Sequence, residues 1–227
     1  MRRLILFDID GTLVGGGPAK VAFEMAMLET YGTSGAVDSY DFSGKTDPQI
    51  ARELLTAAGL EDAVVDAGLA GLWDRYIGEL ESRIIENPMR LLPGVGRLLD
   101  ALDAEPEVAL GLVTGNIVRG ARLKLGSVGL AKCFAVGGYG SDDEVRERLP
   151  AIALKRAFEA WGVRFSPESA VIVGDTPRDV KCGKHEGTRT VAVATGRIPR
   201  ERLETTGADA VFDDFSDVAA VIDALLA

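Results

Sequence analysis

The sequence has a single histidine, His185, and only two cysteines, Cys133 and Cys182, among its 227 residues. A histidine-rich metal site is therefore excluded, and a histidine-based catalytic triad would depend on His185 alone. His185 lies among polar residues where a helix is expected to end, so we assign it no role. Two cysteines are too few for a disulfide framework and lack metal-ligand spacing, which fits a reducing compartment.

Long apolar runs and an excess of positive charge are also missing. Arg2 and Arg3 resemble the start of a signal peptide, but Asp8 and Asp10 interrupt the apolar run that follows. No segment approaches the apolar length that spans a bilayer. The net charge of -10 argues against nucleic-acid or anionic membrane partners, although it does not exclude a small anionic substrate. We expect a cytoplasmic protein, and nothing in the sequence indicates an oligomeric state.

What is present is an ordinary globular composition, with 47% apolar and 26% charged residues. A short apolar run at residues 4–7 predicts a buried strand, and three helical patterns follow at about 18–31, 47–58 and 61–85. From residue 108 onward strands and helices alternate, which is typical of a parallel sheet. We therefore expect the α/β class, a Rossmann-like parallel sheet with an inserted α-helical cap. Its core would comprise residues 1–16 and 92–227, and its cap residues 17–91.

The first strand ends in two carboxylates, Asp8 and Asp10, followed by Gly11. Residues i and i+2 of an extended chain share a face, so both side chains can point into one site. Two like charges at that separation resist joint ionisation unless a cation lies beside them. Ligands of open α/β sheets bind beyond the carboxyl ends of strands, which is where this pair lies.

Two further predicted strands are followed by polar side chains. Thr114 and Asn116 follow one strand, and Asp175 and Asp179 follow the other. If the three strands are neighbours, their terminal side chains converge on one crevice, and several carboxylates there would need a hard cation such as Mg²⁺. Mg²⁺ commonly bridges protein carboxylates and phosphate oxygens, so a phosphoester substrate follows. A carboxylate can then act as nucleophile while a second one transfers protons. The converging residues are Asp8, Asp10, Thr114, Asn116, Asp175 and Asp179.

The chain resembles the haloacid dehalogenase superfamily over nearly its whole length. Residues 7–13 (FDIDGTL), 112–116 (LVTGN) and 173–179 (VGDTPRD) match its first, second and fourth motifs. The resemblance is to the branch with a helical cap, similar to phosphoglycolate phosphatases and β-phosphoglucomutases. It implies a nucleophile at Asp8 and a general acid and base at Asp10. It also implies a Mg²⁺ site made by Asp8, Asp175 and the backbone carbonyl of Asp10.

The same resemblance implies phosphate binding by Thr114 and Asn116. Asp179 would reach the metal through water or orient a neighbouring cation. The third motif of the family is usually a lysine at the start of a helix, and here the sequence departs from it. Arg148 stands at that helix start, whereas Lys155 lies about 10 Å further along the helix axis. We therefore expect Arg148 to be the phosphate-binding cation, with Lys155 as the alternative.

A further lysine, Lys45, lies in a cap segment of sequence FSGKTD and could present a cation to the substrate; a solvated loop lysine is an equal interpretation. The expected function is a Mg²⁺-dependent phosphatase that hydrolyses a small phosphorylated metabolite through an aspartyl-phosphate on Asp8. Three alternatives remain open. They are a sugar phosphomutase, a phosphonate hydrolase with a Schiff base at Lys45, and a non-catalytic binding module.

Overall fold

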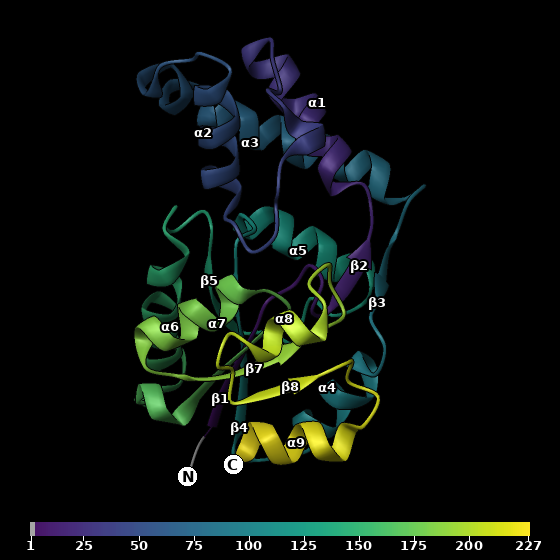
Figure 1. Ribbon diagram of the computed structural model, residues 1–227, viewed down its shortest axis with the longest axis vertical. Helices are drawn as coiled ribbons and strands as arrows, with labels where there is room; N and C mark the ends of the chain where they lie inside the picture. The colour runs from purple at the N-terminus through teal and green to yellow at the C-terminus, as the bar shows by residue number, and fades with distance from the viewer. Residues whose placement is uncertain (1–2) are drawn as a thin grey trace.

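The computed structural model describes residues 3–227. Figure 1 shows three cap helices gathered at one end of the molecule and the α/β core at the other. The strands are β1 (Arg3–Phe7), β2 (Val14–Gly16), β3 (Met89–Leu91), β4 (Val108–Thr114), β5 (Val136–Tyr139), β6 (Ala170–Gly174), β7 (Arg189–Val193) and β8 (Ala210–Phe212). The helices are α1 (Ala19–Tyr31), α2 (Asp47–Ala57), α3 (Asp62–Ile84), α4 (Val95–Asp103), α5 (Val118–Ser127), α6 (Leu149–Trp161), α7 (Pro177–Glu186), α8 (Arg200–Glu204) and α9 (Val218–Leu226).

The core sheet has six parallel strands in the order β5-β4-β1-β6-β7-β8. Strand β1 is central, and Leu6 lies opposite Gly111 of β4 and Ile172 of β6. The three strands whose ends carry the candidate residues are therefore neighbours. The predicted parallel α/β sheet with a helical cap is confirmed.

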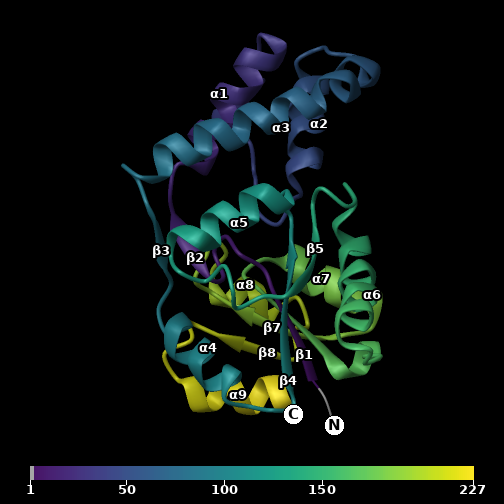
Figure 2. The same ribbon diagram turned by 180° about the vertical axis from the view of Figure 1, so that it is seen from behind.

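Apolar side chains on both faces of β1 explain its central place. Leu6 belongs to the same buried cluster as Leu149 and Ala153 of α6, on one face of the sheet. Phe7 points to the other face, where its cluster includes Leu98 of α4 and Phe215. Figure 2 shows α6 and α7 on one side of the sheet and α4, α5 and α9 around the other. A strand covered on both faces has no need of polar alternation, as its sequence predicts.

The cap joins the core through an antiparallel pair, β2 and β3, in which Val14 lies opposite Leu91 and Gly16 opposite Met89. Neither strand follows from the sequence pattern, which predicts a flexible breaker at residues 15–18. The pairing depends on backbone hydrogen bonds to a segment far along the chain, and glycines carry no side-chain pattern that reveals it. The boundaries proposed from the sequence, residues 17 and 91, lie at the ends of these strands.

The helices carry no candidate membrane segment. Across residues 3–227, none of them combines the length and hydropathy that crossing a bilayer requires.

Candidate active site

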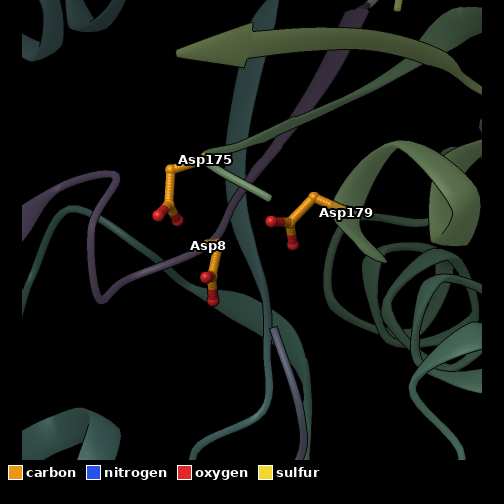
Figure 3. A group of neighbouring side chains, drawn as sticks. All are labelled: Asp8, Asp175 and Asp179. Atoms are coloured by element: carbon orange, nitrogen blue, oxygen red, sulfur yellow. The ribbon is translucent and has the colours of Figure 1, made fainter. Parts of the chain in front are cut away.

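Three carboxylates meet at the carboxyl edge of the sheet. Asp8 follows β1, Asp175 follows β6, and Asp179 lies in the first turn of α7. Figure 3 shows the three side chains gathered together, with the carboxyl groups of Asp175 and Asp179 directed toward Asp8. One oxygen from each lies within 4.8 Å of the other two, and all three residues are buried. Neighbouring parallel strands place Asp8 and Asp175 together, and the helix that follows β6 adds Asp179.

Burial opposes the ionisation of these carboxyl groups, because a charged group is less well solvated inside the protein than in water. It raises the pKa of Asp8 to about 6, against the opposing effect of Arg146. Burial also raises the pKa of Asp175, and the neighbouring charges of Asp179 and Asp8 raise it further. A set of hard oxygen donors with this excess of negative charge fits a divalent cation such as Mg²⁺.

The surrounding chain is shaped to hold Asp175. The hydroxyl of Thr12 donates to Oδ1 of Asp175 at 3.2 Å. A Cβ atom at Gly11, where φ is 82°, or at Gly196 would overlap the Asp175 carboxyl group. Thr195 donates to the Gly11 carbonyl at 2.5 Å and ties the two glycine turns together. The donor set and this tight cradle both fit a metal site.

The cation of the cluster is Arg146, a residue that the sequence analysis missed. Its Nη2 atom lies 3.2 Å from Oδ1 of Asp8 and also donates to Asp179, and its side chain is only 5% exposed. Arg148, the predicted phosphate-binding cation, lies outside the site: its side chain is 65% exposed and pairs with Asp143. Lys155, the alternative, is also at the surface, where it pairs with Glu159.

The two arginines differ because a short 3₁₀ turn, residues 146–148, precedes α6. The turn directs Arg146 inward and leaves Arg148 at the helix start facing solvent. The sequence predicts the helix start at Leu149-Pro150 correctly, but no periodicity reveals a single 3₁₀ turn before it. Two arginines two residues apart were the only available signal.

A second cluster lies around Asp10. Oδ2 of Asp10 accepts hydrogen bonds from Nζ of Lys124 at 2.7 Å and from Nδ2 of Asn116 at 2.8 Å. Oδ1 of Asn116 accepts from Lys124 at 2.6 Å, and its Nδ2 also donates to Oγ1 of Thr114 at 2.8 Å. Asn116 therefore links Asp10 to Thr114, which is fully buried. Both predicted phosphate-binding residues make contacts within the protein at this edge.

Lys124 is the second residue that sequence analysis missed. Its side chain is 5% exposed, in a helix that also buries Ala121 and Leu125. Positions 121, 124 and 125 share one face of a helix. A lysine on an otherwise buried face is a signal that the sequence contains, and it could have identified this residue.

Known proteins of similar sequence and structure agree with the family resemblance of the three motifs. Residues 5–193 match the model of a family described as haloacid dehalogenase-like hydrolase. The chain is 31% identical to an N-acetylmuramic acid 6-phosphate phosphatase of Pseudomonas putida, over 99% of this chain and 97% of that protein. It is 28% identical to a phosphoglycolate phosphatase of Synechococcus elongatus, over 99% of both chains.

The chain belongs to the haloacid dehalogenase-like hydrolases. Within them it is an enzyme of the phosphatase branch, phosphoglycolate phosphatase-like. A hydrolase from Pseudomonas syringae shares the fold, with a TM-score of 0.72, 19% identity and 98% coverage of both chains.

In this haloacid dehalogenase-like hydrolase the cap lies directly against the second motif. The backbone N–H of Asp47 donates to the Gly115 carbonyl at 2.7 Å, and Oδ2 of Asp47 accepts from the Ile117 N–H at 2.8 Å. A Cβ atom at Gly115 would overlap the carbonyl of Lys45. Arg52 of α2 adds an ion pair to Glu144 of the core. The structure therefore has the cap closed over the carboxylate cluster.

Lys45 lies in this closed interface with its charge already paired. Its Nζ atom lies 2.5 Å from Oε2 of Glu53 and 2.8 Å from the Tyr40 hydroxyl, both in the cap. The residue lines the same cavity as Asp8 and Asp10. The structure therefore brings Lys45 to the site, with Glu53 as its counter-ion.

A cavity of about 440 Å³ separates the cap from the cluster. Its core wall carries Asp8, Asp10, Asp175, Arg146 and Lys124, and its cap wall combines apolar side chains with Lys45 and Asp47. Two cations, Lys20 and Arg197, also line it and are exposed. The volume is typical of sites for small molecules. The apolar residues of the cap wall are Phe23, Phe42, Ile50 and Tyr76.

Proposed function

We propose that this enzyme is a Mg²⁺-dependent phosphatase that hydrolyses a small phosphorylated metabolite through an aspartyl-phosphate on Asp8. The observation that carries the proposal is the position of Asp8. It lines the cavity beside Asp175 and Asp179, with the buried guanidinium of Arg146 against one of its oxygens. This arrangement supplies a nucleophile together with charge for an incoming phosphate.

In the first half-reaction a carboxylate oxygen of Asp8 forms a bond to phosphorus while the bond from phosphorus to the leaving oxygen breaks. Asp10 gives its proton to that oxygen, and the alcohol departs. In the second half-reaction Asp10 takes a proton from water as the water oxygen attacks the phosphorus. The acyl-phosphate bond breaks, inorganic phosphate forms, and the Asp8 carboxylate is regenerated.

The remaining residues orient and neutralise the reacting groups. Arg146 would bridge Asp8 and a phosphate oxygen, since its planar guanidinium can bind both. Asp8, Asp175 and the Asp10 carbonyl would hold Mg²⁺, with Asp179 supporting the site, and the ion would supply charge neutralisation for the phosphoryl group. The closed cap would exclude bulk water from the aspartyl-phosphate.

The cavity favours a phosphomonoester that carries a second anionic group. Phosphoglycolate and N-acetylmuramic acid 6-phosphate, the substrates in the names of two relatives, both have a carboxylate besides the phosphate. The guanidinium of Arg197 makes no hydrogen bond or ion pair with the rest of residues 3–227, and Lys20 has only an exposed pair with Asp38. Either cation could receive that carboxylate, so these two compounds are the first substrates to test.

The alternatives are less well supported. A Schiff base at Lys45 needs a free amine, whereas its nitrogen is bound to Glu53 and Tyr40. A binding module has no need of three buried carboxylates around a cavity. A phosphomutase would use the same groups and would require a bisphosphate activator.

The test is phosphate release from a panel of phosphomonoesters with Mg²⁺, using wild-type enzyme and the Asp8→Asn variant. We expect turnover by the wild type and none above background by the variant, because an amide does not attack phosphorus as a carboxylate does. Circular dichroism would establish that the variant is folded. Turnover by folded Asp8→Asn near the wild-type rate would refute the nucleophile, and a requirement for a bisphosphate would favour the phosphomutase.

A further inference from the structure

Lys124 is a buried cation without a place in the reaction described so far. It comes from α5, and its ammonium lies 2.7 Å from Oδ2 of Asp10 and 2.6 Å from Oδ1 of Asn116. Burying an ammonium group is costly even when it is paired, and an apolar side chain of similar length would serve packing as well or better. Packing of α5 therefore does not account for a lysine here.

The partner of Lys124 needs support. The Asp10 side chain is 44% exposed and lines the cavity, three residues beyond the end of β1, where its backbone forms an isolated bridge with Val14. A carboxylate in such a place is free to change rotamer unless other groups hold it. Lys124 and Nδ2 of Asn116 both donate to the same oxygen, Oδ2, while Oδ1 has no hydrogen bond within residues 3–227.

The donors themselves are fixed. Asn116 is held by Thr114 through a 2.8 Å hydrogen bond, and Thr114 is fully buried. Lys124 is buried, and the Asp47 carboxyl lies near enough for its charge to act on the ammonium together with that of Asp10. The result is a rigid pair of donors at one oxygen of Asp10.

We propose that Lys124 is a positioning residue, which with Asn116 fixes Oδ2 of Asp10 and leaves the other oxygen free for proton transfer in the cavity. The proposal rests on the function of Asp10 as general acid and base. Lys124 acts through Asp10 and does not bind the substrate. Its loss should therefore affect proton transfer to the leaving oxygen more than substrate or metal binding.

Leaving groups of different basicity separate this role from a structural one. An alkoxide needs a proton as it leaves, whereas p-nitrophenolate leaves readily without one. Asp10 also acts as base in the second half-reaction, which is common to all substrates, so the comparison must isolate the first half-reaction. We would therefore compare the rate of leaving-group release in the first turnover for the best alkyl phosphate of the panel and for p-nitrophenyl phosphate. The enzymes would be wild type, Lys124→Met, Asp10→Asn and the double variant. Arg122→Met is the matched control, because it removes a positive charge from the exposed side of the same helix.

We expect Lys124→Met to lower the first-turnover rate of leaving-group release at least about tenfold more for the alkyl phosphate than for p-nitrophenyl phosphate. KM and the Mg²⁺ activation constant should stay within about threefold. In the Asp10→Asn background Lys124→Met should add less than about twofold, because the two residues act as one unit. Arg122→Met should behave as wild type.

Three results would overturn the proposal. Equal losses on both substrates would indicate a structural role, a higher KM at unchanged kcat would indicate substrate binding, and additive effects in the double variant would separate Lys124 from Asp10. If Lys124→Met does not fold, Lys124→Arg provides the same comparison, with the smaller expected loss again confined to the alkyl phosphate. If Asp10→Asn itself shows no dependence on the leaving group, Asp10 is not the general acid. That result would refute the proposed function of Asp10, whereas the three results above would refute only the role of Lys124.

Discussion

The Nη2 atom of Arg146 lies 3.2 Å from Oδ1 of Asp8, and both side chains are buried. The same nitrogen donates to Asp179, so one guanidinium joins the proposed nucleophile to the first turn of α7. An arginine from the 3₁₀ turn before α6 therefore supplies the positive charge beside this carboxylate.

Arg146→Ala should therefore lower kcat by about 10²–10³, the usual effect of removing a charge-stabilising donor. Arg148→Ala is the matched control and should stay within about twofold, since its pair with Asp143 is exposed. Steady-state kinetics would measure both. Because removing Arg146 leaves buried carboxylates uncompensated, Arg146→Lys should be included as a variant that keeps the charge. A severe loss in Arg148→Ala alone would contradict the structural assignment.

Removing divalent metal should stop turnover, and Mg²⁺ should restore it. The reason is that Asp8, Asp175 and Asp179 place three buried carboxylates within 4.8 Å, where they need a cation. Ca²⁺ should support the reaction poorly, because it accepts more ligands and bidentate carboxylates than Mg²⁺ and would occupy the attacking oxygen. Phosphate release after chelation and metal addition would show this. Full activity in excess chelator would exclude a metal from the reaction.

Gly115→Ala should hinder cap closure, because the new methyl group would overlap the Lys45 carbonyl. We expect kcat/KM to fall on the order of 100-fold, the scale of a misplaced catalytic group. Small-angle scattering should show a more open molecule. Gly126→Ala in α5 is the control: its methyl group meets no neighbour, and it should add about 0.5–1 kcal/mol of stability. Equal activity of the two variants would mean that the observed closure is not needed for turnover.

The stability of the metal-free protein should depend on Asp47. Burial raises the pKa of this carboxyl to about 6, above its ordinary 3.8. The folded state thus holds a proton that the unfolded state releases, and the contribution of Asp47 becomes unfavourable as the pH rises from about 4 to 6. Asp47→Asn keeps an oxygen that can accept from Ile117 and should be more stable than wild type above pH 6, by up to about 3 kcal/mol.

Urea unfolding at pH 4 and pH 7 would measure this difference, which should nearly vanish at the lower pH. If Asp47→Asn is less stable than wild type at pH 7, the attraction between Asp47 and Lys124 outweighs the burial of the charge.

The sequence predicts the parts of the site that lie at strand ends. Asp8 and Asp175 were found because a buried strand followed by acidic residues places carboxylates at the carboxyl edge of a parallel sheet. Strand and helix alternation predicts a parallel sheet but not its strand order, and the structure places β4, β1 and β6 side by side.

Two cations that reach the site from elsewhere, Arg146 and Lys124, were not predicted. Arg146 depends on one 3₁₀ turn, and a two-residue difference decides whether an arginine points inward or into solvent. The strands β2 and β3 depend on a pairing between Gly16 and Met89, which no local pattern encodes. Lys124 had a helical signal, but a buried lysine cannot be matched to a partner until the fold brings Asp10 beside it.

The pairing of β2 with β3 brings the two ends of the cap segment together. The chain leaves the core at Gly16 and returns beside it at Met89, so the inserted helices are covalently joined to the core at one place. Recombination at those two points would transfer the apolar wall of the cavity between homologues and leave the sheet and its carboxylates intact. Substrate range and chemistry can therefore be inherited separately in this architecture.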